Sequence, residues 1–255
     1  MTHGRLKGKN AIVTGASHGI GRGIALAFAS EGAQLVVTYR SDEGAARQLV
    51  DEIESHGVRA HAERVDGTEV RNADLLVDAA ERQLGRIDVL VNNIGVTTRT
   101  RFLDVTLEDY RYVLDVNLMF PFFLSQRVAR HMLEREVRGS IINVSSISAH
   151  KAISEMAHYQ CSKAGLSMLT KSIAYELAPR GIRVNTLSPG LTATRGNRNQ
   201  WRDDPELWRE RGKDIPLGRA GLPADHAAVA VLLASDEASW MTGSDVVVDG
   251  GESTI

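Results

Sequence analysis

The sequence predicts an α/β fold, a doubly wound sheet of seven parallel strands with helices on both faces, in a single domain over residues 1–255. Short runs rich in Val, Ile and Leu alternate with longer segments whose apolar residues recur at helical spacing. This alternation is typical of parallel strands joined by crossover helices. The near-continuous apolar runs indicate strands that are buried on both faces.

Seven runs have the length and composition of such strands. They are AIVT from Ala11, QLVVT from Gln34, VRAHAER from Val58, VLVNN from Val89, SIINVSS from Ser140, IRVNTLS from Ile182 and DVVVD from Asp245. Amphipathic segments such as residues 43–57 and 72–85 lie between them and end in glycine, which commonly terminates helices. The chain has no repeat, low-complexity tract or linker, so one domain is expected.

Residues 191–222 form the least periodic segment of the chain, and we expect a substrate lid there. The segment is rich in side chains that could bind a polyol, a carboxylate or a phosphate: Arg195, Arg198, Trp201, Arg202, Trp208, Arg209 and Arg211. The alternative is a solvated helix face with tryptophans anchored in the core.

Composition narrows the functional classes. A net charge of −2 over 255 residues argues against nucleic acid or an anionic membrane as a partner. Cys161 is the only cysteine, so an intramolecular disulfide and a multi-cysteine metal site are excluded, and no metal is expected. The polar N-terminus and the lack of an apolar run of about 18 residues lead us to expect a cytoplasmic protein.

A glycine-rich turn follows the first strand and opens a helical segment. Gly15, Gly19 and Gly21 in VTGASHGIGRG have the spacing G-x-x-x-G-x-G, a variant of the dinucleotide fingerprint. Backbone without Cβ atoms turns sharply and approaches a pyrophosphate at a helix N-terminus. A P-loop is excluded because no G-K-[ST] follows. The alternative is a turn that serves only helix–strand packing.

Tyr159 and Lys163 are four residues apart, so on a helix their side chains project from the same face. A neighbouring ammonium favours the phenolate and lowers a tyrosine pKa from its ordinary value of about 10. The pair therefore predicts a proton donor and acceptor that works near neutral pH.

Together these motifs resemble the short-chain dehydrogenase/reductase family, over essentially the whole chain. The resemblance rests on TGASHGIG (residues 14–21), NNIG (92–95), Asn117 in LDVNL, NVSS ending at Ser146, YQCSK (159–163) and PGLTAT (189–194). Ser146 precedes Tyr159 by 13 residues, the offset of the family, whereas Ser145 is expected to support the strand end. The resemblance implies a Rossmann-type fold.

It also implies hydride transfer between a nicotinamide and a carbonyl or alcohol carbon. Tyr159 would act as the general acid and base, and Lys163 would lower its pKa and hold the nicotinamide ribose. Ser146 would polarise the substrate oxygen. Asn117 would hold a water that links Lys163 to solvent.

The cofactor would be bound along the strand ends. The positions implied are Gly15, Ser17, His18, Gly19, Ile20, Gly21, Arg40, Asp66, Gly67, Asn93, Gly95, Tyr159, Lys163, Pro189, Gly190, Thr192 and Thr194. Asp66 would meet the adenine amine, and Thr192 and Thr194 the carboxamide and pyrophosphate. Three positions depart from the family pattern: Ile94 replaces Ala, His18 replaces Arg or Lys, and Gly67 replaces Val.

The second predicted strand ends in Tyr39 and Arg40, without the acidic residue that binds the ribose 2′-hydroxyl of NAD. Arg40 could pair with a 2′-phosphate, so NADP is the preferred cofactor, with NAD still open. The alternative is that Arg40 is a solvated charge at the helix entry, which Asp42 and Glu43 are near enough to occupy.

The motifs are most similar to bacterial glucose-type sugar dehydrogenases and 3-oxoacyl-thioester reductases, so we expect a sugar, polyol or oxoacyl-type substrate. The alternatives are an epimerase or dehydratase-like relative and a catalytically silent NAD(P)-binding regulatory protein. The resemblance suggests a homotetramer built on helices at about 107–134 and 155–178 and on the last strand. His150 and His158 are expected at the surface beside the pocket, and Cys161 in the interior.

Overall fold

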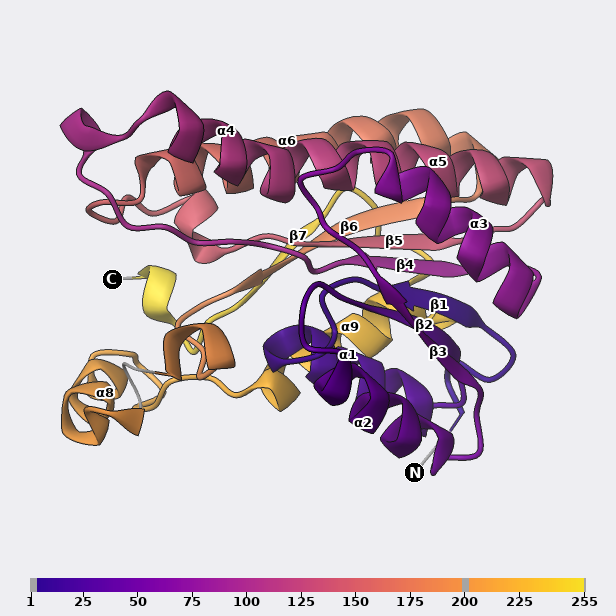
Figure 1. The fold of residues 1–255 in the computed structure, drawn as a ribbon, viewed down its shortest axis with the longest axis horizontal. Coiled ribbons are helices and arrows are strands. Elements are labelled where there is room, and N and C mark those ends of the chain that lie inside the picture. The colour runs from indigo at the N-terminus through magenta and orange to yellow at the C-terminus, as the bar shows by residue number, and fades with distance from the viewer. Residues whose placement is uncertain (1–3, 199–201, 255) are drawn as a thin grey trace.

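A sheet of seven parallel strands runs through the structure, a computed structural model that describes residues 4–198 and 202–254 (Figure 1). The strands lie in the order β3-β2-β1-β4-β5-β6-β7. Their bounds are β1 Asn10–Val13, β2 Gln34–Tyr39, β3 Ala60–Arg64, β4 Val89–Asn92, β5 Ser140–Val144, β6 Arg183–Pro189 and β7 Asp245–Val248. Every neighbouring pair is parallel, so the predicted fold class is confirmed.

Helices cover both faces of the sheet, as Figure 1 shows. One face carries α1 (Gly19–Ser30), α2 (Glu43–Glu54) and α9 (Pro223–Ala234), and the other carries α3 (Asn72–Leu84), α4 (Leu107–Leu114), α5 (Phe120–Glu134) and α6 (Ala157–Leu177). Each layer encloses its own apolar core. Phe28 is fully buried in the first core, and Phe120 is 1% exposed in the second. Because the strands carry apolar residues on both faces, the two cores sandwich the sheet.

The helix expected at 107–134 is present but interrupted. A π-helical turn, η2 (Asp115–Met119), joins α4 to α5. Pro121 in the first turn of α5 has no N–H to donate to the carbonyl of Asn117 four residues earlier, which disfavours regular α-helix at this point. Such π-helical turns are frequent at functional sites.

The predicted lid contains a helix of its own. After β6 the chain forms a short 3-10 turn, η5 (Arg195–Asn197), and then α8 (Pro205–Lys213). The Asp204 side chain caps α8 by accepting a hydrogen bond from Leu207 N at 2.9 Å. A bridge between Thr192 and Gly221 brings the two ends of the segment together. In Figure 1, α8 stands apart from the helices that cover the sheet. Trp201 lies outside the described residues.

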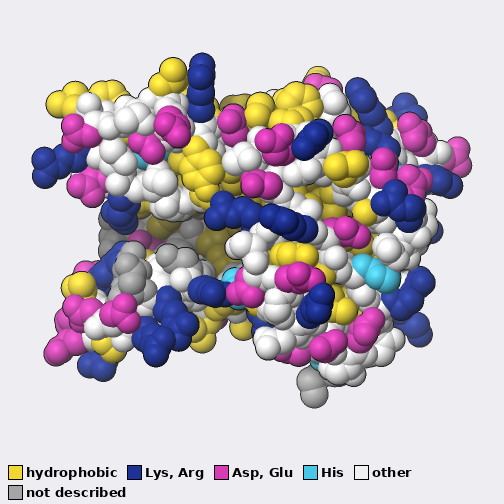
Figure 2. All heavy atoms as spheres, viewed as in Figure 1, with side chains coloured by type: hydrophobic (Ala, Val, Ile, Leu, Met, Phe, Trp, Pro, Cys, Tyr) yellow, Lys and Arg dark blue, Asp and Glu magenta, His cyan; other side chains and the backbone are white. Residues whose placement is uncertain are grey.

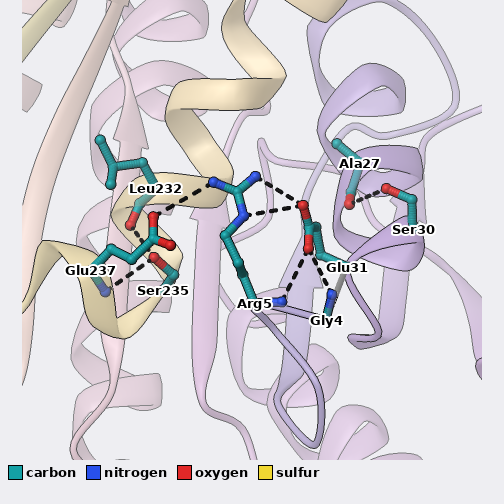
Figure 3. Close-up of polar contacts among 8 residues, drawn as sticks. All are labelled: Gly4, Arg5, Ala27, Ser30, Glu31, Leu232, Ser235 and Glu237. Atoms are coloured by element: carbon teal, nitrogen blue, oxygen red, sulfur yellow. Dashed lines mark hydrogen bonds and ion pairs between the residues drawn. The ribbon is translucent and has the colours of Figure 1, made fainter. Parts of the chain in front are cut away.

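The amino ends of the strands are tied together by ion pairs. Figure 3 shows Arg5 between Glu31, just after α1, and Glu237 in the turn after α9. Glu31 accepts hydrogen bonds from Gly4 N at 2.9 Å and from Arg5 N, Nε and Nη2 at 3.0, 3.1 and 2.9 Å. Lys9 Nζ lies 2.8 Å from Asp236 Oδ1 at the same edge. Within the described residues, no helix has the length and apolarity needed to cross a membrane.

Candidate active site

A cleft of about 850 Å³ opens at the carboxyl ends of the strands. Figure 2 shows this hollow between the part of the molecule that carries α8 and the helices above it. Of the predicted site residues, all but Gly21 and Asn117 line the cleft. It runs from Arg40 after β2, past the glycine turn, to Tyr159 on α6. The chain order of the strands thus brings residues more than a hundred positions apart to one groove, as expected for an open α/β sheet.

The glycine turn forms the floor of the middle of the cleft. Gly15 and Gly19 have φ angles of +62° and +59°, where glycine is favoured. A Cβ at Gly19 would lie 3.4 Å from the Thr194 side chain, so the turn and the segment after β6 approach closely. His18 precedes α1 without a side-chain cap, which leaves the first N–H groups of the helix to an anion.

Two predicted cofactor residues support this turn from behind. Asn93 Nδ2 donates to the carbonyls of Thr14 and Gly15 at 2.9 and 3.0 Å. A Cβ at Gly21 would lie only 2.3 Å from that same nitrogen. Gly21 is therefore needed for packing of α1 against the end of β4, and it lies in the wall behind the cleft rather than on its surface.

Tyr159 and Lys163 face the cleft from α6. The Tyr159 hydroxyl is hydrogen-bonded to the side chains of Ser146 and Thr97. Lys163 Nζ lies 5.9 Å from the centre of the Tyr159 ring and donates to Val144 O at 2.9 Å. The sequence thus predicts the proximity of the phenol, ammonium and Ser146 hydroxyl correctly, but it gives no signal for Thr97.

The expected direction of the Tyr159 pKa is wrong for the protein without cofactor. Burial raises the pKa of the phenol, and the hydrogen bonds from Ser146 and Thr97 oppose that rise without cancelling it. Burial also lowers the pKa of Lys163 to about 8. Burial therefore disfavours the charged form of each group. At neutral pH the phenol is therefore protonated and ready to donate.

The two adjacent serines both line the cleft but have different partners. Ser145 is 4% exposed, and its hydroxyl donates to Lys163 O at 3.0 Å, so it joins the end of β5 to α6. The Ser146 Oγ accepts from Ser148 N at 3.1 Å, and its side chain is hydrogen-bonded to Tyr159. The choice of Ser146 as the residue that meets the phenol agrees with this arrangement.

Asn117 lies in η2 and is completely buried. Its Oδ1 accepts from Val96 N at 2.8 Å, and its Nδ2 donates to Val96 O at 2.9 Å and Ser162 Oγ at 3.1 Å. A Cβ at Gly95 would lie 3.4 Å from Lys163 Nζ and 3.5 Å from Asn117 Oδ1, so both polar groups lie against that glycine. The side chain of Asn117 is fully used within the protein.

Arg40 at the far end of the cleft is held by a residue that the sequence does not reveal. Its Nη1 donates to the Tyr112 hydroxyl at 3.0 Å. Asp42 instead pairs with His18, at 3.1 Å, and with Arg195 from the lid. Glu43 pairs with Arg47. Neither acidic neighbour is paired with Arg40, whose side chain is exposed.

Two further polar residues have internal partners. The Asp66 pKa is lowered, chiefly by the hydrogen bond from Thr68 N, which lies 3.0 Å from Oδ1. Thr192 Oγ1 donates to Gly190 O at 2.9 Å and lies 2.8 Å from Nε2 of His226. The backbone of residues 190–192 is thereby fixed beside the cleft.

Of three expectations about residues near Tyr159, those for His158 and Cys161 are wrong and that for His150 is confirmed. His158 is 2% exposed rather than at the surface, and its ring contacts Thr98 Oγ1. His150 is at the surface and pairs with Asp245 at 2.8 Å. Cys161 is exposed instead of interior, because it lies on the outward face of α6. Across residues 4–198 and 202–254, no group of three or more His, Cys, Asp or Glu is arranged to hold a metal ion.

Known proteins resemble the chain along nearly its whole length. The family model described as enoyl-(acyl carrier protein) reductase matches residues 15–253. A 3beta-hydroxysteroid dehydrogenase from Eggerthella lenta is 42% identical over 96% of this chain and 94% of the relative. An L-rhamnose 1-dehydrogenase (NADP(+)) from Thermoplasma acidophilum is 35% identical over 96% of both chains. The crystal structure of a short-chain type dehydrogenase/reductase from Mycobacterium marinum superposes with a TM-score of 0.87 at 38% identity, covering 97% of this chain and 96% of the other.

Proposed function

We propose that this chain, which belongs to the short-chain dehydrogenase/reductase family, transfers a hydride between NADP(H) and the carbonyl or hydroxyl carbon of a small sugar-, polyol- or oxoacyl-type substrate. The chain is an oxidoreductase that acts on CH–OH groups. The observation that carries the rest is the hydrogen-bonded trio of Tyr159, Ser146 and Thr97, next to Lys163, in one cleft.

The cleft fits an extended dinucleotide. Glycines keep it open between its walls. A Cβ at Gly19 would contact the Thr194 side chain, and a Cβ at Gly95 would contact Lys163 Nζ. The uncapped start of α1 suits a pyrophosphate, Asp66 and Arg40 suit the adenosine end, and Lys163 suits ribose hydroxyls. When bound, the cofactor supplies or accepts the hydride.

The protein's own residues handle the proton. In reduction, the protonated Tyr159 phenol donates its proton to the substrate oxygen as negative charge develops there. The Ser146 hydroxyl donates a hydrogen bond to the same oxygen and stabilises that charge. Lys163 stabilises the phenolate that remains, because it is the cation beside the ring.

Reprotonation of Tyr159 needs a path to solvent. The side chain of Asn117 is hydrogen-bonded to Val96 and Ser162, so we do not assign to it the binding of a water molecule. The backbone carbonyl of Asn117 lies in the π-helical turn and has no α-helical donor, because Pro121 has no N–H. We assign the water-holding role to that carbonyl.

The preference for NADP rests on Arg40. Tyr112 orients its guanidinium at the end of the cleft, and Asp42 and Glu43 are paired elsewhere. Arg40→Ala is expected to raise the KM for NADPH by about 10- to 100-fold, because it removes a charge-assisted contact worth about 1.5–3 kcal/mol. The KM for NADH should change by less than about twofold. Equal changes for the two cofactors would reject the phosphate-binding role.

The activity itself is tested by following nicotinamide absorbance with NADP(H) and NAD(H) against sugars, polyols, oxoacyl thioesters and simple ketones. Turnover with NADP(H) is expected for at least one of these classes. Binding of NADPH without turnover of any substrate would instead favour the silent regulatory alternative. Isomerisation without net change in absorbance would favour the epimerase-like alternative.

Further proposals concern organisation and assembly. We propose one domain over residues 1–255 with a substrate lid at about 191–222, located in the cytoplasm. We also propose a homotetramer, because α4, α5 and α6 expose large apolar side chains: Leu107, Tyr110, Phe122, Phe123, Met168 and Tyr175. Strand β7 ends the sheet with a free edge, and Val247 on it is 42% exposed. Light scattering of the purified protein measures the assembly directly.

A further inference from the structure

Three cations from loops and the lid, all outside the predicted cofactor positions, line the cleft. Arg99 comes from the segment after β4, Lys151 from the segment after β5, and Arg211 from α8 in the lid. Among the described residues, the carboxylates that line the cleft are Glu252 and Asp66, and Asp66 belongs to the predicted cofactor positions. Three separate parts of the chain thus place positive charge around the space that remains for a substrate. Guanidinium and ammonium groups around this space attract a negatively charged group of a substrate.

Arg99 is held close to the Tyr159 hydroxyl by its neighbours in sequence. Thr97 hydrogen-bonds the phenol, Thr98 contacts the buried His158 ring, and Thr100 N donates to Glu155 O at 2.9 Å. These contacts fix the backbone on both sides of Arg99. The Arg99 side chain is exposed and has no hydrogen-bond or ion-pair partner among the described residues.

Lys151 is anchored on the opposite wall. Its carbonyl accepts from Gln160 Nε2 at 2.7 Å, next to Tyr159 on α6. Its Nζ donates to Glu252 O at 3.0 Å, so the ammonium is held at the C-terminal segment by a backbone carbonyl. The Glu252 carboxylate accepts from Leu191 N at 2.7 Å. That contact ties the Glu252 carboxylate to the start of the lid.

Arg211 approaches from α8. Its guanidinium lies 5.6 Å from the centre of the Trp208 ring, a cation–π arrangement that orients it along the helix. Arg209 is exposed on the same helix but does not line the cleft. In Figure 2, Lys and Arg side chains gather on the α8 side of the hollow.

We propose that the substrate carries an anionic group, a carboxylate or a phosphate, on the same small molecule as the reacting carbonyl or hydroxyl, and that Arg99 with Arg211 and Lys151 binds it. Guanidinium groups pair with such anions through two parallel hydrogen bonds. This inference rests on the proposed function and adds the substrate class.

The anion keeps its charge through the reaction. In reduction, the carbonyl carbon gains the hydride from NADPH, and the carbonyl oxygen gains the Tyr159 proton. The products are the hydroxy compound and NADP⁺, and oxidation runs the same exchange in reverse. The three cations therefore bind and position the substrate and do not take part in the proton transfer. Their removal should mainly raise the KM for the substrate.

The test compares matched substrates. Each hydroxy or oxo acid in the panel is paired with its primary amide, and each sugar phosphate with its parent sugar. We expect kcat/KM for the anionic member of at least one pair to exceed that of the neutral member by roughly 10- to 100-fold. The acid–amide arm and the phosphate–sugar arm separate the two sources of negative charge.

Variants assign the effect to the named residues. Arg99→Gln should lower kcat/KM for the anionic substrate by roughly tenfold or more, leave its neutral partner within twofold, and leave NADPH binding by fluorescence unchanged. Arg211→Gln should act in the same direction, and Arg209→Gln is the matched control on α8. Equal turnover of both members of every pair, or an Arg99→Gln effect no larger than that of Arg209→Gln, would overturn the inference. Absence of turnover with the whole panel would overturn the proposed function itself.

Discussion

The two ends of the parallel sheet are built differently. At the amino ends of the strands, charges are paired: Arg5 joins Glu31 and Glu237, and Lys9 joins Asp236 (Figure 3). At the carboxyl ends, Lys163 is buried against a backbone carbonyl and an aromatic ring, beside a phenol whose pKa burial has raised. The polar groups at the amino ends stabilise the fold, while those at the carboxyl ends are arranged for a reaction.

This contrast has a thermodynamic consequence. A paired charge stabilises the fold, and its removal costs stability without touching chemistry. A buried charge without a carboxylate partner costs folding free energy, and it persists only where a function requires it. Removal of a charge should therefore have opposite effects on stability at the two ends of the sheet.

Lys163→Met should give the largest effect. Turnover is expected to fall by about 10²- to 10⁴-fold, because the phenolate loses its neighbouring cation. Stability at pH 7 should rise by up to about 3 kcal/mol, since burial lowers the Lys163 pKa from 10.5 to about 8. Denaturant unfolding with NADPH-dependent assays in parallel measures both quantities.

The pH dependence of Lys163→Met provides an internal control. Between pH 8 and 10.5 the unfolded wild type still binds the lysine proton that the folded protein has lost, so this group makes stability rise with pH there. Below pH 8 both states are protonated and the cost is constant. The variant should lack this rise, and an unchanged slope would contradict burial of the ammonium.

Glu31→Gln should have the opposite effect to Lys163→Met, because it should lower stability and leave turnover unchanged. It weakens four hydrogen bonds to a carboxylate and should lower the free energy of unfolding by roughly 1.5–3 kcal/mol, with kcat/KM unchanged. The Glu31 pKa is lowered from 4.5 to about 2, chiefly by the Arg5 side chain. Its stabilisation is therefore present above about pH 4.5 and is lost as the pH falls towards 2. Acid unfolding curves that coincide for wild type and variant would refute this.

Asp236→Asn should have the smallest effect. The Asp236 side chain is 89% exposed in its pair with Lys9, and exposed pairs contribute between about 0 and 1 kcal/mol. Unfolding in low and high salt measures this contribution, which should diminish as salt increases. If Asp236→Asn lowered the free energy of unfolding as much as Glu31→Gln, burial would not determine the strength of the ion pairs at this edge of the sheet.

Much of the fold and site follows from local sequence. All seven strands were predictable, six of them because they contain a short apolar run. The edge strand β3 has the sequence AHAER and begins at Ala60 rather than Val58. The cleft-lining positions from Gly15 to Thr194 follow strand ends, and parallel strands bring their carboxyl ends together.

Other features depend on packing that no local pattern encodes. Tyr112 meets Arg40 only because α4 lies near the end of β2, and Thr97 meets Tyr159 only through the path of the loop after β4. The spacing of Tyr159 and Lys163 predicts their proximity. It does not predict the burial that raises the pKa of Tyr159 and lowers the pKa of Lys163. Asn117 was predicted as a site residue, but its π-helical turn follows from Pro121 and its side chain faces inward.

The most direct test of the proposed proton donor removes one oxygen atom. Tyr159→Phe removes the phenolic hydroxyl that Ser146 and Thr97 hold in the cleft, while the ring beside Lys163 remains. Single-turnover oxidation of bound NADPH by a substrate should slow by about 10²- to 10⁴-fold, with NADPH affinity unchanged within about twofold. Hydride transfer at the wild-type rate in Tyr159→Phe would contradict the assignment of this phenol as the proton donor.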